Sequence, residues 1–275
     1  MAAARATAGD LGLRADRSVV LHDANRITLR LLPCDLLVRV APATHQGAQF
    51  ELDLAQQLVE AGCPMAAVDP RVEPRVHHRD GFAITSWTYY EPVSTAVIPP
   101  PAYADALARL RAGMRELDVA VPHHTERVDQ ARRLVASPAD TPELGEADRE
   151  LLAVALRDLG HRVSRSGAAE QLLHGEPHPG NLLATAGGLL FVDLETCCRG
   201  PVEFDLAHAP DGVGERYPGV DLGLLRDCRL LVLAMITTWR WDRDDQYPDG
   251  RELGRAWLRQ LRAALQERGP EAPPG

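Results

Sequence analysis

Short apolar runs separated by turn residues open the chain. Residues 18–22, 26–32 and 36–41 are rich in Val, Ile, Leu and Thr, which is the composition of β-strands. The segments between them, residues 23–25 and 33–35, contain Asp, Asn and Pro, which favour turns. This alternation predicts an antiparallel meander of three strands.

One helix and one further strand are predicted before a proline-rich stretch. Phe50, Leu54 and Leu58 recur at four-residue spacing, which indicates a helix of about three turns. Residues 81–87 form another β-type run. The stretch 92–101 is rich in proline, and we expect it to act as a hinge between two lobes.

Beyond this stretch the apolar positions follow the spacing of amphipathic helices. Such stripes cover residues 103–117, 152–163, 224–235 and 253–265. A β-type island lies at residues 174–193, a polar loop is expected over 136–147, and residues 269–275 are expected to form a frayed tail. The chain is therefore predicted to be an α+β protein. Its first lobe, residues 1–90, holds a small antiparallel sheet with one helix, and its mainly helical second lobe, residues 91–275, holds a β-hairpin.

Charge and cysteine content narrow the class of protein. The 275 residues include 39 acidic and 30 basic side chains, all of the latter Arg, which gives a net charge of −9. Without a basic tract the chain is a poor candidate for nucleic-acid binding. Five cysteines without a C-x-x-C motif predict neither a disulfide framework nor a cysteine zinc site. We expect a cytoplasmic protein with no membrane partner, and the oligomeric state is not indicated.

The β-type island concentrates polar side chains around a predicted hairpin. Two apolar runs, residues 182–183 and 189–192, flank Ala186-Gly187-Gly188, which has turn chemistry. Asn181 and Asp193 are equidistant from Gly187, so a turn centred there would place them opposite each other, about 5 Å apart. An amide oxygen and a carboxylate at that distance can share Mg²⁺. Glu176, in the preceding loop, would lie beside the metal and its phosphate.

Three segments resemble the aminoglycoside phosphotransferase and choline kinase-like family. The loop His-Gly-Glu-Pro-His-Pro-Gly-Asn, residues 174–181, resembles the catalytic loop of that family, and the segment 191–193 resembles its metal-binding segment. Residues 200–207 are similar to its G-x-x-x-x-D-L-A segment. In the first lobe, residues 37–40 resemble the strand that carries a nucleotide-phosphate contact, and Glu51 lies where the helix partner of that contact would be.

The resemblance implies a two-lobed protein-kinase-like fold and a phosphotransferase activity. ATP or GTP would donate its γ-phosphoryl group to a hydroxyl of a small molecule, either an antibiotic such as an aminoglycoside or a metabolite. Asp193 and Asn181 would hold Mg²⁺, and Glu176 would position or deprotonate the acceptor hydroxyl. Glu195 lies on the same strand face as Asp193, so it is either a second carboxylate ligand or a surface residue.

The resemblance also assigns supporting roles. His174 belongs to the catalytic loop, and together with Asp205 it would brace that loop. Arg39, paired with Glu51, would contact the α- and β-phosphates, although a plain surface ion pair is the alternative for these two residues alone. The adenine slot would be bordered by Trp87, Tyr89 and Tyr90.

Two departures from the family pattern suggest a second function. Glu176 stands where the family usually has Asp, and its extra methylene moves the carboxylate. The turn expected to cover the phosphates, residues 22–25, has no glycine. The alternative is therefore a catalytically weak, pseudokinase-like module that binds nucleotide and acts through partners.

An acceptor pocket is predicted near the end of the third helical stripe. Trp239 or Trp241 would form an apolar wall, and the nearby carboxylates of Asp242 and Asp245 would bind acceptor hydroxyls or amines. The alternative is that the tryptophans belong to the core and the acids are solvated.

A zinc-hydrolase motif is not predicted at His174 and His178, and two other histidine pairs are expected to be solvated. His174 and His178 flank Glu176, but the glycine and prolines between and beside them forbid the continuous helix that a zinc hydrolase motif needs. The pairs 77–78 and 123–124 lie in polar sequence and are expected to be solvated.

Overall fold

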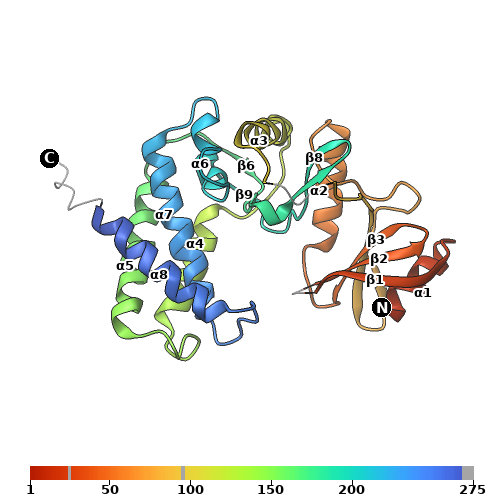
Figure 1. Cartoon of the computed structure of the whole chain (residues 1–275), viewed down its shortest axis with the longest axis horizontal. Helices are drawn as coiled ribbons and strands as arrows, with labels where there is room; N and C mark the ends of the chain where they lie inside the picture. The colour runs from red at the N-terminus through yellow and green to blue at the C-terminus, as the bar shows by residue number, and fades with distance from the viewer. Residues whose placement is uncertain (24–25, 94–96, 268–275) are drawn as a thin grey trace. The chain divides into compact units, whose positions relative to one another are not determined.

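The computed structural model describes residues 1–23, 26–93 and 97–267 (Figure 1). The predicted turn over 23–25 and the predicted hinge over 92–101 thus lie partly outside the described residues, and the expected tail lies wholly outside them. The chain forms two compact units. Unit 1 is Met1–Val119 with Glu176–Cys197, and unit 2 is Ala120–Gly175 with Cys198–Gly275. A functional division after residue 90 stays a prediction.

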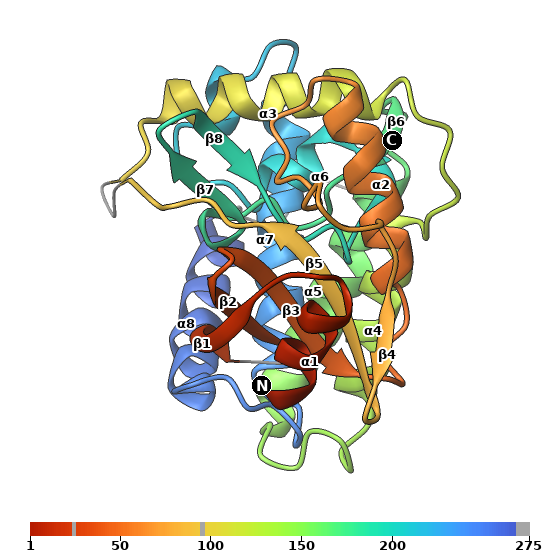
Figure 2. The ribbon, with the colours of Figure 1, turned by 90° about the vertical axis from the view of Figure 1, so that its right-hand side faces the viewer.

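Unit 1 is built on a five-stranded antiparallel sheet with the strand order β1-β2-β3-β5-β4 (Figure 2). The strands are β1 (Ala15–Asp23), β2 (Ile27–Pro33), β3 (Leu36–Pro42), β4 (His77–Arg79) and β5 (Phe82–Thr88). The predicted meander and the predicted strand after it are confirmed. The short strand β4 was not predicted, and it contains His77 and His78, of which His77 is half-buried.

Three helices belong to unit 1. They are α1 (Ala2–Asp10), α2 (Ala48–Glu60) and α3 (Pro100–Met114). Helix α1 packs on the sheet, where its Ala3, Ala4 and Ala8 share one buried apolar cluster with residues of β2 and β3 such as Leu29 and Leu36. Helix α2, which was predicted, buries Leu52, Leu54, Ala55 and Leu58, and it also buries the carboxylate of Glu51 in its first turn.

The predicted hairpin is formed by β7 (Leu182–Thr185) and β8 (Gly188–Phe191), and it belongs to unit 1. Leu182 pairs with Phe191 and Thr185 pairs with Gly188, so the connection is the two residues between them. The turn is therefore centred between Ala186 and Gly187 and not on Gly187 itself. In this register Asn181 faces Val192, whose N–H donates to the Asn181 carbonyl at 3.0 Å. The expectation that Asn181 and Asp193 face each other across the ladder is wrong by one residue.

Unit 2 is mainly helical. Helices α4 (His124–Ala136), α5 (Glu146–Ser164), α7 (Leu222–Trp239) and α8 (Gly250–Glu267) surround an apolar core. The short helix α6 (Val202–Leu206) follows a two-stranded sheet of β6 (Glu170–Leu173) and β9 (Cys198–Pro201). The three predicted helices of this unit and the loop before α5 are confirmed. Helix α4 and the β6–β9 pair were not predicted.

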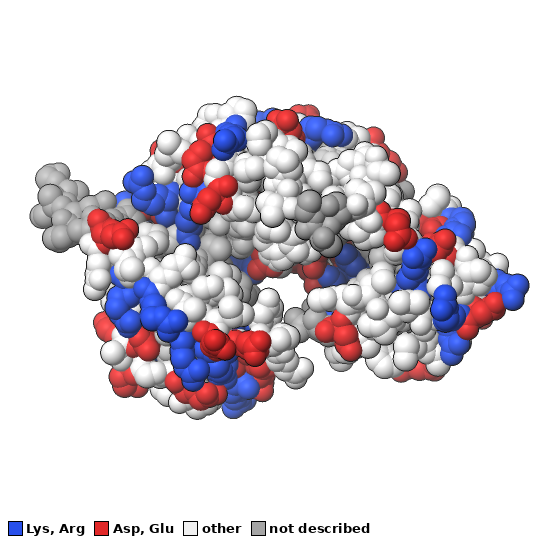
Figure 3. All heavy atoms as spheres, viewed as in Figure 1, with Lys and Arg blue, Asp and Glu red and all other residues white. Residues whose placement is uncertain are grey.

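Charges of both signs are interspersed on the face drawn in Figure 3. Ion pairs join helices of unit 2, such as Arg262 of α8 with Asp148 of α5 at 2.5 Å. Within residues 1–23, 26–93 and 97–267, no helix has the length and apolar character that crossing a membrane requires.

Candidate functional site

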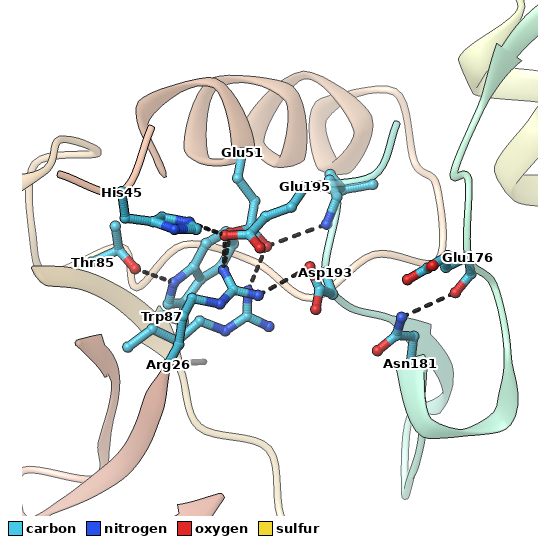
Figure 4. A network of polar contacts seen from close by, with 11 residues as sticks. Arg26, His45, Glu51, Thr85, Trp87, Glu176, Asn181, Asp193 and Glu195 are labelled. Carbon is cyan, nitrogen blue, oxygen red and sulfur yellow. Dashed lines mark hydrogen bonds and ion pairs between the residues drawn. The ribbon is translucent and has the colours of Figure 1, made fainter. Parts of the chain in front are cut away.

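A cluster of carboxylates surrounds the guanidinium of Arg26 in unit 1 (Figure 4). The Nη1 atom of Arg26 lies 2.9 Å from Glu51 Oε2 and 2.6 Å from Glu195 Oε1, and its Nη2 lies 3.0 Å from Asp193 Oδ1. The Arg26 side chain is only 13% exposed. Burial alone would lower the pKa of Arg26, but the three carboxylates outweigh it and raise the pKa. One cation thus holds together three anions from distant parts of the chain.

Glu51 is the most deeply buried member of this cluster. Its side chain is 1% exposed and lies in the first turn of α2, where the helix dipole favours a negative charge. It pairs with Nη1 of Arg39 from β3 and accepts the N–H of Leu194 at 3.3 Å. The Arg39 guanidinium carbon lies 5.0 Å from the centre of the Trp87 ring. The structure therefore pairs Arg39 with Glu51, and contact with a nucleotide stays a prediction.

The carboxyl group of Glu195 has a raised pKa. Burial is the main cause that raises the pKa of its carboxyl, and the nearby charges of Glu51 and Asp193 add to it. Arg26 and His45 oppose this rise, and His45 Nε2 lies 2.5 Å from Glu195 Oε1. Arg26 contacts all three carboxylates, Arg39 pairs with Glu51, and His45 lies against Glu195, so each carboxylate of the cluster has a basic side chain beside it.

Asp193 follows the hairpin in an uncommon backbone conformation. Its φ angle is +71°, in the left-handed region that Asp visits more readily than most residues. In Figure 4 its carboxylate lies between Arg26 and the Asn181–Glu176 pair. Strained residues of this kind are often found where a side chain must be aimed at a ligand.

The loop that carries Glu176 is held by hydrogen bonds within unit 1. The Asn181 amide nitrogen donates to the Glu176 carbonyl at 3.0 Å, and the His178 N–H donates to the same carbonyl at 2.8 Å. The Tyr103 hydroxyl donates to the Pro177 carbonyl at 2.5 Å. Because the amide nitrogen of Asn181 is engaged in this way, its side-chain oxygen is the atom that could bind a metal.

The segment before Glu176 is fixed in unit 2 by a buried carboxylate. Asp205, which is fully buried, accepts the N–H of His174 at 3.1 Å and the N–H of Gly175 at 2.8 Å. The His174 side chain is also fully buried. A catalytic role for His174 and a supporting role for Asp205 stay predictions.

The residues predicted to border adenine lie in and after β5. The indole of Trp87 is 3% exposed and donates to Thr85 Oγ1 at 2.9 Å. The Tyr90 hydroxyl accepts the N–H of Ala67 at 3.3 Å, whereas the Tyr89 ring lies under the guanidinium of Arg30, 3.8 Å from its carbon. Nucleotide binding by these residues stays a prediction.

The predicted acceptor residues differ in burial within unit 2. Trp241 is 4% exposed and belongs to the core, which favours the alternative interpretation for this residue. Trp239 is half-buried at the end of α7, with the Arg127 guanidinium carbon 5.0 Å from its ring centre. Asp245 pairs with Arg240 at 3.2 Å, and Asp242 accepts the N–H of Asp244 at 2.9 Å.

Sequence analysis missed Arg26 and His45. Arg26 is the first residue of the second apolar run and directly follows the glycine-free turn. A basic residue beside a turn that is expected to cover phosphates could have been recognised as a phosphate contact. His45 lies in a loop with no pattern around it. The side chains of Asp193, Glu195 and Asn181 offer oxygen donors, which are the ligands that a hard divalent cation such as Mg²⁺ prefers.

Comparison with known proteins gives a family match and a set of similar folds. The profile of the phosphotransferase enzyme family matches residues 12–243. No curated protein matches the sequence. The structure of an amicoumacin kinase in complex with AMP-PNP, Ca²⁺ and Ami is 12% identical to this chain. It has a TM-score of 0.70 over 93% of this chain and 89% of that chain.

Two other solved structures are similar over nearly their whole length. An aminoglycoside phosphotransferase in a ternary complex with ADP and hygromycin B is 12% identical, with a TM-score of 0.68 over 99% of this chain and 100% of that chain. The choline kinase of Streptococcus pneumoniae is 13% identical, with a TM-score of 0.66 over 96% and 97%. At such identities the likeness is one of fold, and the predicted α+β, kinase-like fold is confirmed.

Proposed function

The chain belongs to the phosphotransferase enzyme family, and we propose that it transfers the γ-phosphoryl group of ATP or GTP to a hydroxyl of a small molecule, an antibiotic or a metabolite. The observation that carries this proposal is the meeting of Glu51, Asp193 and Glu195 around Arg26, with Arg39 paired to Glu51. Similar folds that hold AMP-PNP or ADP support a nucleoside triphosphate as the donor. Five free cysteines support a reducing, cytoplasmic location.

The charged cluster would bind the nucleotide. Arg39, held by Glu51 beside Trp87, would present its guanidinium fork to the α- and β-phosphates. Asp193 and Asn181 would hold Mg²⁺, with Glu195 as a further carboxylate ligand, and the metal would supply charge neutralisation of the β- and γ-phosphates. The same carboxylates are those that hold Arg26, so its guanidinium would leave them when metal and nucleotide bind and would pair with a phosphate oxygen.

Glu176 would act on the acceptor. Its loop is held by Tyr103 and Asn181, so the longer side chain of Glu is carried on a fixed backbone. The acceptor oxygen forms a bond to the γ-phosphorus while the bond to the β–γ bridging oxygen breaks, and the hydroxyl proton passes to the Glu176 carboxylate late in the reaction. The products are a phosphate ester and the nucleoside diphosphate.

Residues at and after the end of α7 would bind the acceptor. Trp239 keeps an exposed part of its indole, whereas Trp241 is enclosed by the core, so Trp239 is the aromatic residue better able to contact an acceptor. Asp242 and Asp245 remain candidates for its polar groups. Phosphoryl transfer to a hydroxyl compound does not depend on which of these residues contacts it.

Incubation with Mg²⁺ and ATP or GTP over a panel of hydroxylated antibiotics and metabolites tests the proposal. We expect nucleoside diphosphate to form only when an accepted hydroxyl compound is present, with a phosphate ester detected by mass spectrometry. Saturable nucleotide binding without acceptor-dependent turnover across the panel would favour the pseudokinase-like module instead.

A further inference from the structure

The histidine pair at the start of α4 is not solvated as the sequence predicts. His124 is fully buried, and its ring packs against the ring of His123, with ring centres 4.3 Å apart, and against Phe204, at 5.2 Å. His123 is the N-cap of α4. Because this segment is polar in composition, the sequence did not indicate that a helix begins here and that His124 is buried.

The buried ring of His124 has an unsatisfied nitrogen. Neither of its ring nitrogens has a hydrogen-bond partner among the described residues. Burial lowers the pKa of His124 to about 4, with the charge of His123 adding to this, so the ring is neutral near pH 7. The Arg199 backbone lies close enough to favour a proton on one nitrogen, although the contact does not reach hydrogen-bond geometry. The other nitrogen of a neutral ring is a lone-pair acceptor, and a carbonyl cannot satisfy it.

His123 and Glu170 complete a group of three candidate ligands. The Nε2 atom of His123 lies 3.0 Å from Glu170 Oε1 at the start of β6. Its Nδ1 lies 2.7 Å from the Thr125 hydroxyl oxygen and 3.4 Å from the Thr125 backbone nitrogen. In the tautomer in which Nδ1–H donates to that hydroxyl, Nε2 carries the lone pair that a metal needs. One ligand atom from each of His123, His124 and Glu170 lies within 4.8 Å of the others.

We propose that His123, His124 and Glu170 bind a zinc ion that joins the start of α4 to β6, with water in the fourth position. Two imidazoles and one carboxylate form a ligand set that suits Zn²⁺, whereas Mg²⁺ prefers oxygen ligands alone. Zinc bonds of roughly 2.0–2.2 Å require the ligand atoms to close to about 3.3 Å from one another, a movement of about 1 Å or slightly more. The half-exposed side chains of His123 and Glu170 can make that movement.

Charge at the site is balanced by acidic side chains. The N-terminus of α4 carries a partial positive charge that opposes a cation. Glu126, which accepts the N–H of His123 at 3.4 Å in the capping box, and Glu170 both offset it.

Titration of the metal-free, full-length protein with Zn²⁺ tests this site. Isothermal titration calorimetry is expected to show one equivalent bound with a dissociation constant below about 1 µM, and an excess of Mg²⁺ should not displace it. Binding to the folded state alone should also raise the melting temperature. Co²⁺ should give the absorption bands of a four-coordinate site with nitrogen and oxygen ligands.

Two conservative variants test whether Glu170 and His123 bind zinc or only stabilise the fold. Glu170→Gln removes a ligand charge at a half-exposed position, and His123→Asn removes a ligand while keeping a residue that caps helices well. Each is expected to weaken Zn²⁺ binding at least tenfold while melting like the wild type without metal. His161→Asn, an exposed histidine on α5 of the same unit, is the matched control and should bind Zn²⁺ as the wild type does. Absence of saturable binding, or equal binding by all three variants, overturns the proposal.

Discussion

The buried carboxylate of Asp205 and the partly exposed carboxylates of Asp193 and Glu195 are held by different kinds of partner. Asp205 of unit 2 accepts N–H groups from the backbone of His174 and Gly175, and a backbone donor cannot leave without unfolding the segment. Asp193 and Glu195 of unit 1 are held by the side chain of Arg26, which can rotate away. Asp205 is therefore suited to fixing a loop, whereas Asp193 and Glu195 are suited to exchanging one cation for another.

The largest effect is expected at Asp193. Asp193→Asn should lower turnover at least about a thousandfold, or ~4 kcal/mol in the barrier, because the ligand charge that holds Mg²⁺ is lost. The side chain is 31% exposed and Arg26 keeps Glu51 and Glu195, so the melting temperature should change little. Steady-state kinetics together with thermal denaturation measure both quantities. A variant with the wild-type rate would remove Asp193 from the proposed metal site.

Substitution of Glu176 is expected to lower turnover less than substitution of Asp193. Glu176→Gln should lower kcat at least about a hundredfold, which is the size typical of losing a positioned acid or base group. Nucleotide affinity should hardly change because the charged cluster around Arg26 is intact. Glu176→Asp is the informative partner, since it restores the shorter side chain usual in the family on the same loop. Equal turnover by the wild type and the Gln variant would instead support the binding module.

Asp205 tests the other half of the comparison. Asp205→Asn should lower the free energy of unfolding by roughly 2 kcal/mol, because charge-assisted hydrogen bonds to two buried N–H groups are weakened. Urea denaturation measures this loss, and Asp129→Asn, which alters an exposed pair with Arg132, should change the stability by less than about 0.5 kcal/mol. If Asp205→Asn were as stable as the wild type yet inactive, Asp205 would act in the chemistry and not as a brace.

The elements that could be predicted from the sequence are those whose signal is local. The hairpin β7–β8 follows from apolar runs on both sides of a glycine-containing turn, but its register depends on the turn type, which shifted the partner of Asn181 by one residue. Helix α1 was missed because its buried face consists of three alanines and Thr7, which give no amphipathic stripe. The short strands β6 and β9 were missed because each finds its partner far along the chain.

The candidate site could be predicted in part for the same reason. Glu176, Asn181 and Asp193 lie within one short segment, so their spacing carries information. Arg26 was missed because its role arises only when residues near positions 26, 51 and 195 meet in the folded unit. The burial of His124 was hidden in the same way, since Phe204 and Glu170 come from later segments.

The smallest and most specific effect is expected at Arg26. Arg26→Gln removes the cation that competes for Asp193 and Glu195, so affinity for Mn²⁺ without nucleotide should rise about fivefold, equivalent to the ~1 kcal/mol of a favourable ion pair. The KM for ATP should rise by a similar factor, because the guanidinium is no longer available to a phosphate oxygen. Opposite changes in metal and nucleotide affinity are what an exchangeable cation requires.

Arg26→Lys is the matched control for that experiment. It keeps the positive charge but lacks the fork that bridges several carboxylates, so its metal affinity should lie between those of the wild type and the Gln variant. Mn²⁺ binding followed by electron paramagnetic resonance measures the metal affinity directly, without relying on turnover. If Arg26→Gln bound Mn²⁺ no more tightly than the wild type and melted several degrees lower, Arg26 would be a fixed structural partner of its carboxylates, and the contrast with Asp205 would disappear.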